Sequence, residues 1–220
     1  MRMITNYANK KISESWFLKE FSKTLKLPKR KPGKPVILAV AGPSCVGKTT
    51  AMKFIQKKLP YFARISHDEM RLFIYRRGFP DSPKVESFIY DNAPSYVLAE
   101  KYLKLGYSVI LDDNLVSKPV KIKSVRNLAR KFRIKFFVFS VLATEDFIKK
   151  KLKEKIKARN FLKTGVFRDW RVGLEHFRRS KGFDYDKFDK LYLAKINSAK
   201  PLNRQLKEAI GTLKEEMEVK

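Results

Sequence analysis

The sequence has a single cysteine, Cys45, in 220 residues, and it contains no long apolar run. One cysteine cannot form an intramolecular disulfide or supply the thiolates of a zinc site, and no stretch approaches the roughly 18 apolar residues that span a bilayer. The N-terminus also lacks the continuous apolar core of a secretory signal. These absences exclude a disulfide scaffold and a membrane-spanning protein, and they predict a cytoplasmic one.

Acidic residues are scarce as well, because 22 aspartates and glutamates stand against 50 lysines and arginines. The formal net charge is +28 and the isoelectric point is near 10.2, which favours a polyanionic partner such as nucleic acid. Residues 1–34 carry a net charge of +8 and residues 118–181 carry +16, whereas residues 35–117 carry +3 and residues 182–220 carry +1. Two interpretations stay open, a specific polyanion site and ordinary solvation of helices by lysine.

The hydrophobic content of 44% is enough for one well-packed domain with a small appendage. Apolar residues recur at near-helical spacing over residues 11–26, at Ile12, Trp16, Phe17, Phe21 and Leu25. The segment from Pro28 to Pro35, rich in proline, glycine and lysine, breaks this pattern. We therefore predict a basic helical extension and linker over residues 1–34, and one domain over residues 35–220. The extension either binds nucleic acid or packs on the domain through its aromatic face.

Strand and helix patterns alternate along the rest of the chain. Short apolar runs predict strands at 36–41, 62–66, 108–111, 135–142 and 190–194. Helical patterns begin near residue 48 and cover 68–77, 84–105, 119–132, 144–158, 168–180 and 201–217. This alternation predicts a three-layer α/β/α fold with a five-stranded parallel sheet, which binds ligands at the carboxyl ends of its strands.

The strongest motif is Gly42-Pro43-Ser44-Cys45-Val46-Gly47-Lys48-Thr49, which fits G-x-x-x-x-G-K-[ST] between a predicted strand and a predicted helix. In such a loop the backbone N–H groups converge on phosphate oxygens. Lys48 can reach the β and γ phosphates, and the Thr49 hydroxyl can ligate Mg²⁺. The motif, together with Thr50, predicts a nucleotide site that binds ATP.

Asp68 and Arg71 stand three residues apart after the second predicted strand, and so share one face of a helix's first turn. A carboxylate there can take a proton from an acceptor hydroxyl, and an arginine beside it can hold a phosphate. The alternative is that Asp68 only caps the helix while Arg71 is solvated. His67 adjoins the carboxylate but can point to the opposite side.

Two further groups follow. Asp112 and Asp113 end the third predicted strand, and Asp112, which directly continues the apolar run, is the better candidate for organising Mg²⁺. A basic segment at about 155–181 predicts a mobile lid over the transferring phosphoryl group. Arg159 and Lys163, four residues apart, are its best candidates for neutralising charge. The alternative is that the aspartates and the basic segment are only solvated by water.

Taken together, these motifs resemble those of P-loop kinases of the phage-type polynucleotide 5′-kinase family, relatives of the zeta-toxin and chloramphenicol phosphotransferase kinases. Asp68 and Arg71 match the family's D-D-x-R, although Glu69 replaces the second aspartate. Its D-T-N is echoed by Asp112-Asp113-Asn114, and its lid motif R-N-x-x-R by Arg159-Asn160-Phe161-Leu162-Lys163. The resemblance covers about residues 35–215, and it implies Asp68 as general base and Arg71 as ligand of an acceptor phosphate.

The sequence thus predicts an ATP-dependent kinase that uses Mg²⁺ and transfers the γ-phosphoryl group to a hydroxyl. The preferred acceptor is the 5′-hydroxyl of a polynucleotide, DNA or RNA, because the two basic blocks can contact several phosphates. One alternative is a small-molecule kinase acting on a nucleotide sugar, an antibiotic or a metabolite. Another is a nucleic-acid-binding P-loop protein with weak ATPase activity.

Overall fold

A computed structural model describes residues 3–5, 11–25, 28, 33–79, 87–88, 93–112, 119–157, 169–181 and 192–218. Its main sheet has five parallel strands in the order β4-β5-β3-β6-β7, which confirms the three-layer α/β class predicted from the sequence. These strands are β3 (Ile37–Ala41), β4 (Phe62–Ile65), β5 (Ser108–Asp112), β6 (Phe136–Leu142) and β7 (Tyr192–Asn197). Every residue of β3 and β5 is buried, as expected for strands covered on both faces.

Helices follow the strands in the expected alternation. They are α1 (Glu14–Thr24), α2 (Lys48–Lys58), α3 (His67–Tyr75), α5 (Ala93–Lys104), α6 (Pro119–Phe132), α7 (Glu145–Lys157), α9 (Trp170–Lys181) and α10 (Leu202–Glu218). Among the residues that the structure describes, no helix has the length and apolarity needed to cross a membrane.

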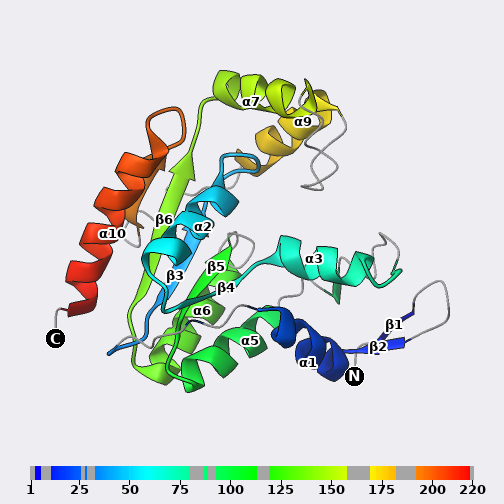
Figure 1. The fold of residues 1–220 in the computed structure, drawn as a ribbon, viewed down its shortest axis with the longest axis vertical. Coiled ribbons are helices and arrows are strands. Elements are labelled where there is room, and N and C mark those ends of the chain that lie inside the picture. Colours follow the sequence, from blue (N-terminus) through cyan, green and yellow to red (C-terminus); the bar gives the residue numbers. More distant parts are fainter. Residues whose placement is uncertain are drawn as a thin grey trace. The chain divides into compact units, whose positions relative to one another are not determined.

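The contacts divide the chain into two compact units. The first combines residues 1–39 with 56–136, and the second combines 40–55 with 137–220. In the first unit β4 pairs with β5 in the register Phe62 with Ser108 to Ile65 with Leu111, and α5 packs on both strands. In the second unit β6 pairs with β7, α10 packs on β7, and α7 lies alongside α9 (Figure 1).

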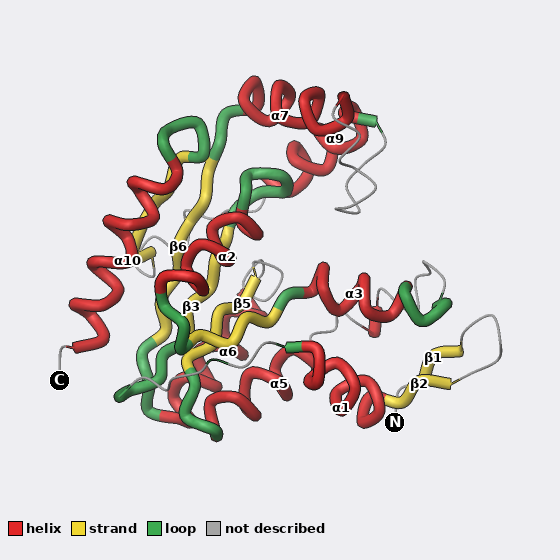
Figure 2. Tube along the Cα trace, in the orientation of Figure 1, coloured by secondary structure: helices red, strands yellow, loops and turns green. Residues whose placement is uncertain are grey.

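The N-terminal segment differs from the predicted continuous helix. Lys11–Ser13 form β2, which pairs antiparallel with β1 (Met3–Thr5) directly before α1 (Figure 2). The helix begins only at Glu14 because Ser13 is its N-cap, with the Ser13 side chain accepting a hydrogen bond of 3.2 Å from the Trp16 N–H.

The described residues test two other predicted elements in part. Helix α5 covers Ala93–Lys104 and residues 87–88 are also helical, all within the predicted span of 84–105, while residues 84–86 and 89–92 lie outside the described part of the chain. Strand β7 covers Tyr192–Asn197 and so extends beyond the predicted end at residue 194, while residues 190–191 lie outside the described part. Its residues are mostly half-buried, so apolar periodicity marks its ends poorly.

Helix α1 belongs to the aromatic core of the first unit. The side chains of Phe17 and Phe21 are 0% and 1% exposed, and their rings stack at a centroid distance of 5.4 Å. Phe73 of α3 meets both rings edge-on, at 5.7 and 5.3 Å. The Arg77 guanidinium lies 3.5 Å from the centre of the Phe73 ring. This packing supports the interpretation that the extension packs on the domain through its aromatic face. Binding of nucleic acid by the extension stays a prediction.

The replacement Phe17→Ala should lower the free energy of unfolding by about 3–5 kcal/mol, because it leaves a cavity among these rings. Lys19→Ala is the matched control, since Lys19 is exposed on the same helix and its loss should change stability by less than about 0.5 kcal/mol. Urea denaturation followed by circular dichroism measures both variants. Equal stability of the two would show that α1 is not part of the core.

Candidate active site

The loop of residues 42–49 has a backbone that only particular residues tolerate. Gly42 has a φ of 145°, and a Cβ atom at this position would lie 2.0 Å from the backbone oxygen of Val141. Cys45 and Gly47 also have positive φ values, of 69° and 101°. Positive φ values at these three positions of one loop turn its backbone tightly, as in the loops whose N–H groups bind phosphate.

Lys48 bends back over this loop. Its Nζ donates to the backbone oxygens of Gly42 at 3.0 Å and Pro43 at 2.7 Å, so the ammonium group lies over the loop's first turn. Thr49 and Thr50 follow in the exposed first turn of α2, which contains no acidic residue. The positive end of the helix dipole is therefore left for an anion. A fixed ammonium, a glycine-shaped loop and an acid-free helix start fit the phosphates of a nucleotide.

Two serines that are remote in sequence brace the same loop. The Ser44 N–H donates to Ser180 Oγ at 2.8 Å, and Ser180 lies in the last turn of α9. Ser198, which follows β7, donates its hydroxyl to the backbone oxygen of Val46. Neither serine is predicted from the sequence, since no motif surrounds them and they lie more than a hundred residues from the loop.

The first turn of α3 carries the predicted acceptor residues. Ser66 is the N-cap residue, so Asp68 lies inside the helix and is not its cap. The Asp68 side chain is exposed and Arg71 is half-buried, with the Arg71 guanidinium 5.9 Å from the centre of the Tyr75 ring. Their three-residue separation places them on one face of the helix. The first turn of α3 thus carries an exposed carboxylate and a half-buried guanidinium on one face.

His67 turns inward and binds Asp112. The His67 N–H donates to Asp112 Oδ2 at 2.5 Å, and Nδ1 of its ring lies 2.8 Å from Asp112 Oδ1. Nε2 of the same ring lies 3.5 Å from Ser95 Oγ. All three residues are buried, with Ser95 at 0%, His67 at 1% and Asp112 at 6% exposure. Because these groups are buried and bound to one another, the contacts fix the start of α3 on the end of β5.

A second pair links the same helix turn to β4. Glu69 forms an ion pair with Arg64, whose side chain is only 10% exposed. The role of Glu69 is therefore structural, because its carboxylate pairs with Arg64 of β4. The three acidic or imidazole side chains at the start of α3 thus divide their roles: His67 and Glu69 hold the helix, while Asp68 faces solvent.

Several predicted residues lie outside the described part of the chain, namely Asp113, Asn114, Arg159 and Lys163. Of the segment 155–181, the structure describes the end of α7 and all of α9. In the described ranges, no three His, Cys, Asp or Glu side chains come together as a metal site.

The parallel sheet and the loop together define a kinase-like P-loop NTPase fold. A family model described as an AAA domain (AAA_33) matches residues 37–177, and the chain belongs to this family. No curated protein matches the sequence.

Solved structures show the same fold at low sequence identity. A gluconokinase from Sinorhizobium meliloti 1021 aligns with a TM-score of 0.53 at 16% identity, over 86% of this chain and 96% of that one. A structure of the PezAT toxin-antitoxin system of Streptococcus pneumoniae gives 0.59 at 15% identity, over 94% and 99%. A chain of the Pnkp1/Rnl/Hen1 RNA repair complex gives 0.51 at 17% identity, over 74% and 49%.

The replacement Asp112→Ala should lower the free energy of unfolding by about 2–4 kcal/mol, because it leaves two buried donors of His67 without an acceptor. Asp68→Ala, two residues from Ser66 on the same helix, removes an exposed carboxylate and should cost less than about 1 kcal/mol. Thermal and urea denaturation compare the two variants. If the Asp112 variant were as stable as the Asp68 variant, Asp112 would not anchor α3.

Proposed function

We propose that this protein is an ATP-dependent kinase that transfers the γ-phosphoryl group of ATP to the 5′-hydroxyl of a polynucleotide. The proposal is carried by the first turn of α3, where a solvent-exposed carboxylate and a guanidinium are presented one helical turn apart by buried anchors. A P-loop alone serves ATPases, GTPases and kinases equally. An acceptor-binding turn is what a kinase needs in addition.

Asp68 is the proposed general base. Its carboxylate takes the proton of the acceptor hydroxyl as that oxygen bonds to the γ-phosphorus and the bond to the β-phosphate oxygen breaks. Positioned proton transfer of this kind contributes about 10² to 10⁴ in rate. Because His67 and Glu69 on either side are engaged in structural contacts, Asp68 is the carboxylate of this turn that remains exposed to a substrate.

Lys48 and the loop from Gly42 to Thr50 are the proposed ATP-binding residues. The Lys48 ammonium would neutralise charge on the transferring group, as Arg159 and Lys163 of the lid segment would. When bound, Mg²⁺ neutralises phosphate charge. Thr49 and Asp112 are its proposed protein ligands, and for Asp112 we expect contact through water, since both of its oxygens already bind His67.

The polynucleotide acceptor is supported by charge. The chain carries a formal +28, and residues 118–181 alone carry +16. Each phosphate contacted by a lysine or arginine adds affinity through release of counterions, and a single small acceptor would use only a few of these cations. Arg71 is the proposed ligand of the phosphate on the 3′ side of the reacting nucleoside, because a guanidinium can hold a phosphate through two hydrogen bonds.

The acceptor's 3′ phosphate provides a test of this assignment. A nucleoside 3′-monophosphate should be phosphorylated on its 5′-hydroxyl at least about tenfold faster than the plain nucleoside, because charge-assisted hydrogen bonds contribute about 1.5–3 kcal/mol. Arg71→Ala should erase this difference, whereas Arg76→Ala, an exposed arginine at the end of α3, should preserve it. Transfer of labelled γ-phosphate to both acceptors measures the ratio.

Equal rates on the two acceptors in the unmodified protein would contradict a polynucleotide kinase and favour a small-molecule kinase. Hydrolysis of ATP without transfer to any acceptor would instead favour a nucleic-acid-binding P-loop protein with weak ATPase activity.

A further inference from the structure

Helices α7 and α9 of the second unit carry far more positive than negative charge. Their 25 residues include ten lysines and arginines and four aspartates and glutamates. Two of those carboxylates are already paired with arginines of α9. Glu145 Oε1 lies 2.5 Å from Arg178 Nη2, and Glu175 pairs with Arg179 on the same helix. The lysines of α7 are therefore the main uncompensated charge on this surface.

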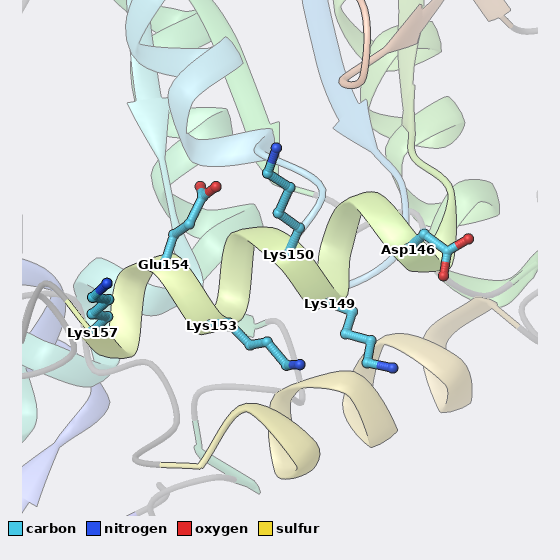
Figure 3. Close-up of a pocket in the computed structure, with 6 residues that line it drawn as sticks. All are labelled: Asp146, Lys149, Lys150, Lys153, Glu154 and Lys157. Atoms are coloured by element: carbon cyan, nitrogen blue, oxygen red, sulfur yellow. The ribbon is translucent and has the colours of Figure 1, made fainter.

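A pocket of about 400 Å³ lies on α7, lined by Asp146, Lys149, Lys150, Lys153, Glu154 and Lys157. Figure 3 shows these side chains spread along the helix, with Lys149 and Lys153 extending toward α9 and Lys150 and Glu154 extending the other way. Four of its six lining residues are lysines, so an anion is the ligand that this pocket suits.

Trp170 orders two of these lysines. The ammonium groups of Lys149 and Lys153 lie 5.6 and 4.7 Å from the centre of its ring, and the Arg171 guanidinium lies 5.5 Å from it. Two like charges four residues apart on a helix repel each other, and the electron-rich ring offsets part of this cost. Lysines held in this way lose less entropy on binding a ligand than freely moving ones.

An aromatic side chain lies next to the cations of this surface. Trp170 of α9 is half-buried, and its ring is contacted by the Lys149 and Lys153 ammonium groups. Cations that alternate with an aromatic group are characteristic of single-stranded nucleic-acid sites, where the cations contact phosphates and the aromatic side chains contact bases. An anionic bilayer would instead require a broad apolar face for insertion.

We infer that the α7–α9 surface, defined by Lys149, Lys153, Trp170 and Arg171, binds a single-stranded polynucleotide. The inference rests on the proposed function and deepens it, since it assigns part of the acceptor's affinity to a surface outside the P-loop and the start of α3. The strand's phosphates contact the lysines, and a base packs at Trp170.

Binding of a 3′-labelled single-stranded oligonucleotide of about 20 nucleotides, without ATP, tests the inference by fluorescence anisotropy at several salt concentrations. The variant Lys149→Gln/Lys153→Gln should bind about 25-fold more weakly at about 0.1 M salt, and the slope of log K against log salt should fall by about 1.4. These values follow from about 0.7 released ions per phosphate contact on a single strand.

The matched control is Lys207→Gln/Lys214→Gln, which removes the same charge from exposed positions on α10. We expect it to bind within about twofold of the unmodified protein, with an unchanged salt slope. Trp170→Leu keeps every charge, and it should weaken binding about fivefold or more because it removes the aromatic contact and the ordering of the two lysines. Transfer to a nucleoside 3′-monophosphate should be unaffected in the Lys149/Lys153 variant.

Equal losses in the two double variants would overturn the inference, because binding would then reflect total charge alone. Tighter binding to vesicles of phosphatidylserine and phosphatidylcholine than to the oligonucleotide would also overturn it. The two proposals fail separately. Oligonucleotide binding through these lysines without phosphoryl transfer would refute the kinase function only, and transfer to 5′-hydroxyl ends with unchanged binding in the lysine variant would refute this surface only.

Discussion

The double contact between Asp112 and His67 is the interaction on which the candidate site depends. One carboxylate at the end of β5 binds both the backbone and the ring of the residue that begins α3. Because these groups are buried, each needs its partner, and helix α3 has little freedom to shift. At its other end the helix is held by the aromatic packing of Phe73 with α1. Asp68 and Arg71 therefore project from a helix fixed at both ends.

The predicted reacting groups and most of the excess positive charge lie in different segments of the chain. Residues 35–117 hold most of the predicted reacting groups and carry a net charge of only +3, whereas residues 118–181 carry +16. The P-loop binds phosphate through backbone shape, since Gly42 fits only without a Cβ and Cys45 and Gly47 have positive φ values. Lysines on α7 act at longer range and are sensitive to salt. For the proposed polynucleotide acceptor, such a division would attract the polyanion without placing excess positive charge on the first turn of α3.

Local patterns predicted the five strands and the P-loop because both are set by neighbouring residues: apolar runs for the strands and glycines for the loop. They also placed Asp68 and Arg71 on one helix turn. The patterns did not predict the Ser13 cap, which delays α1, or the inward turn of His67 to Asp112, 45 residues away. Ser180 and Ser198 contact the loop from still greater sequence distances. Contacts of this kind depend on the tertiary fold, so they cannot be predicted from the spacing of neighbouring residues.

The most direct test of the kinase assignment is transfer of radiolabelled γ-phosphate from ATP to a panel of 5′-hydroxyl oligonucleotides and small hydroxyl compounds, with a reaction that lacks acceptor. We expect label on the 5′ end of the oligonucleotides, none in the Lys48→Ala variant, and a rate lower by about 10² or more in Asp68→Asn with nearly unchanged ATP affinity. Label appearing only on a small compound, or full activity in Asp68→Asn, would contradict it.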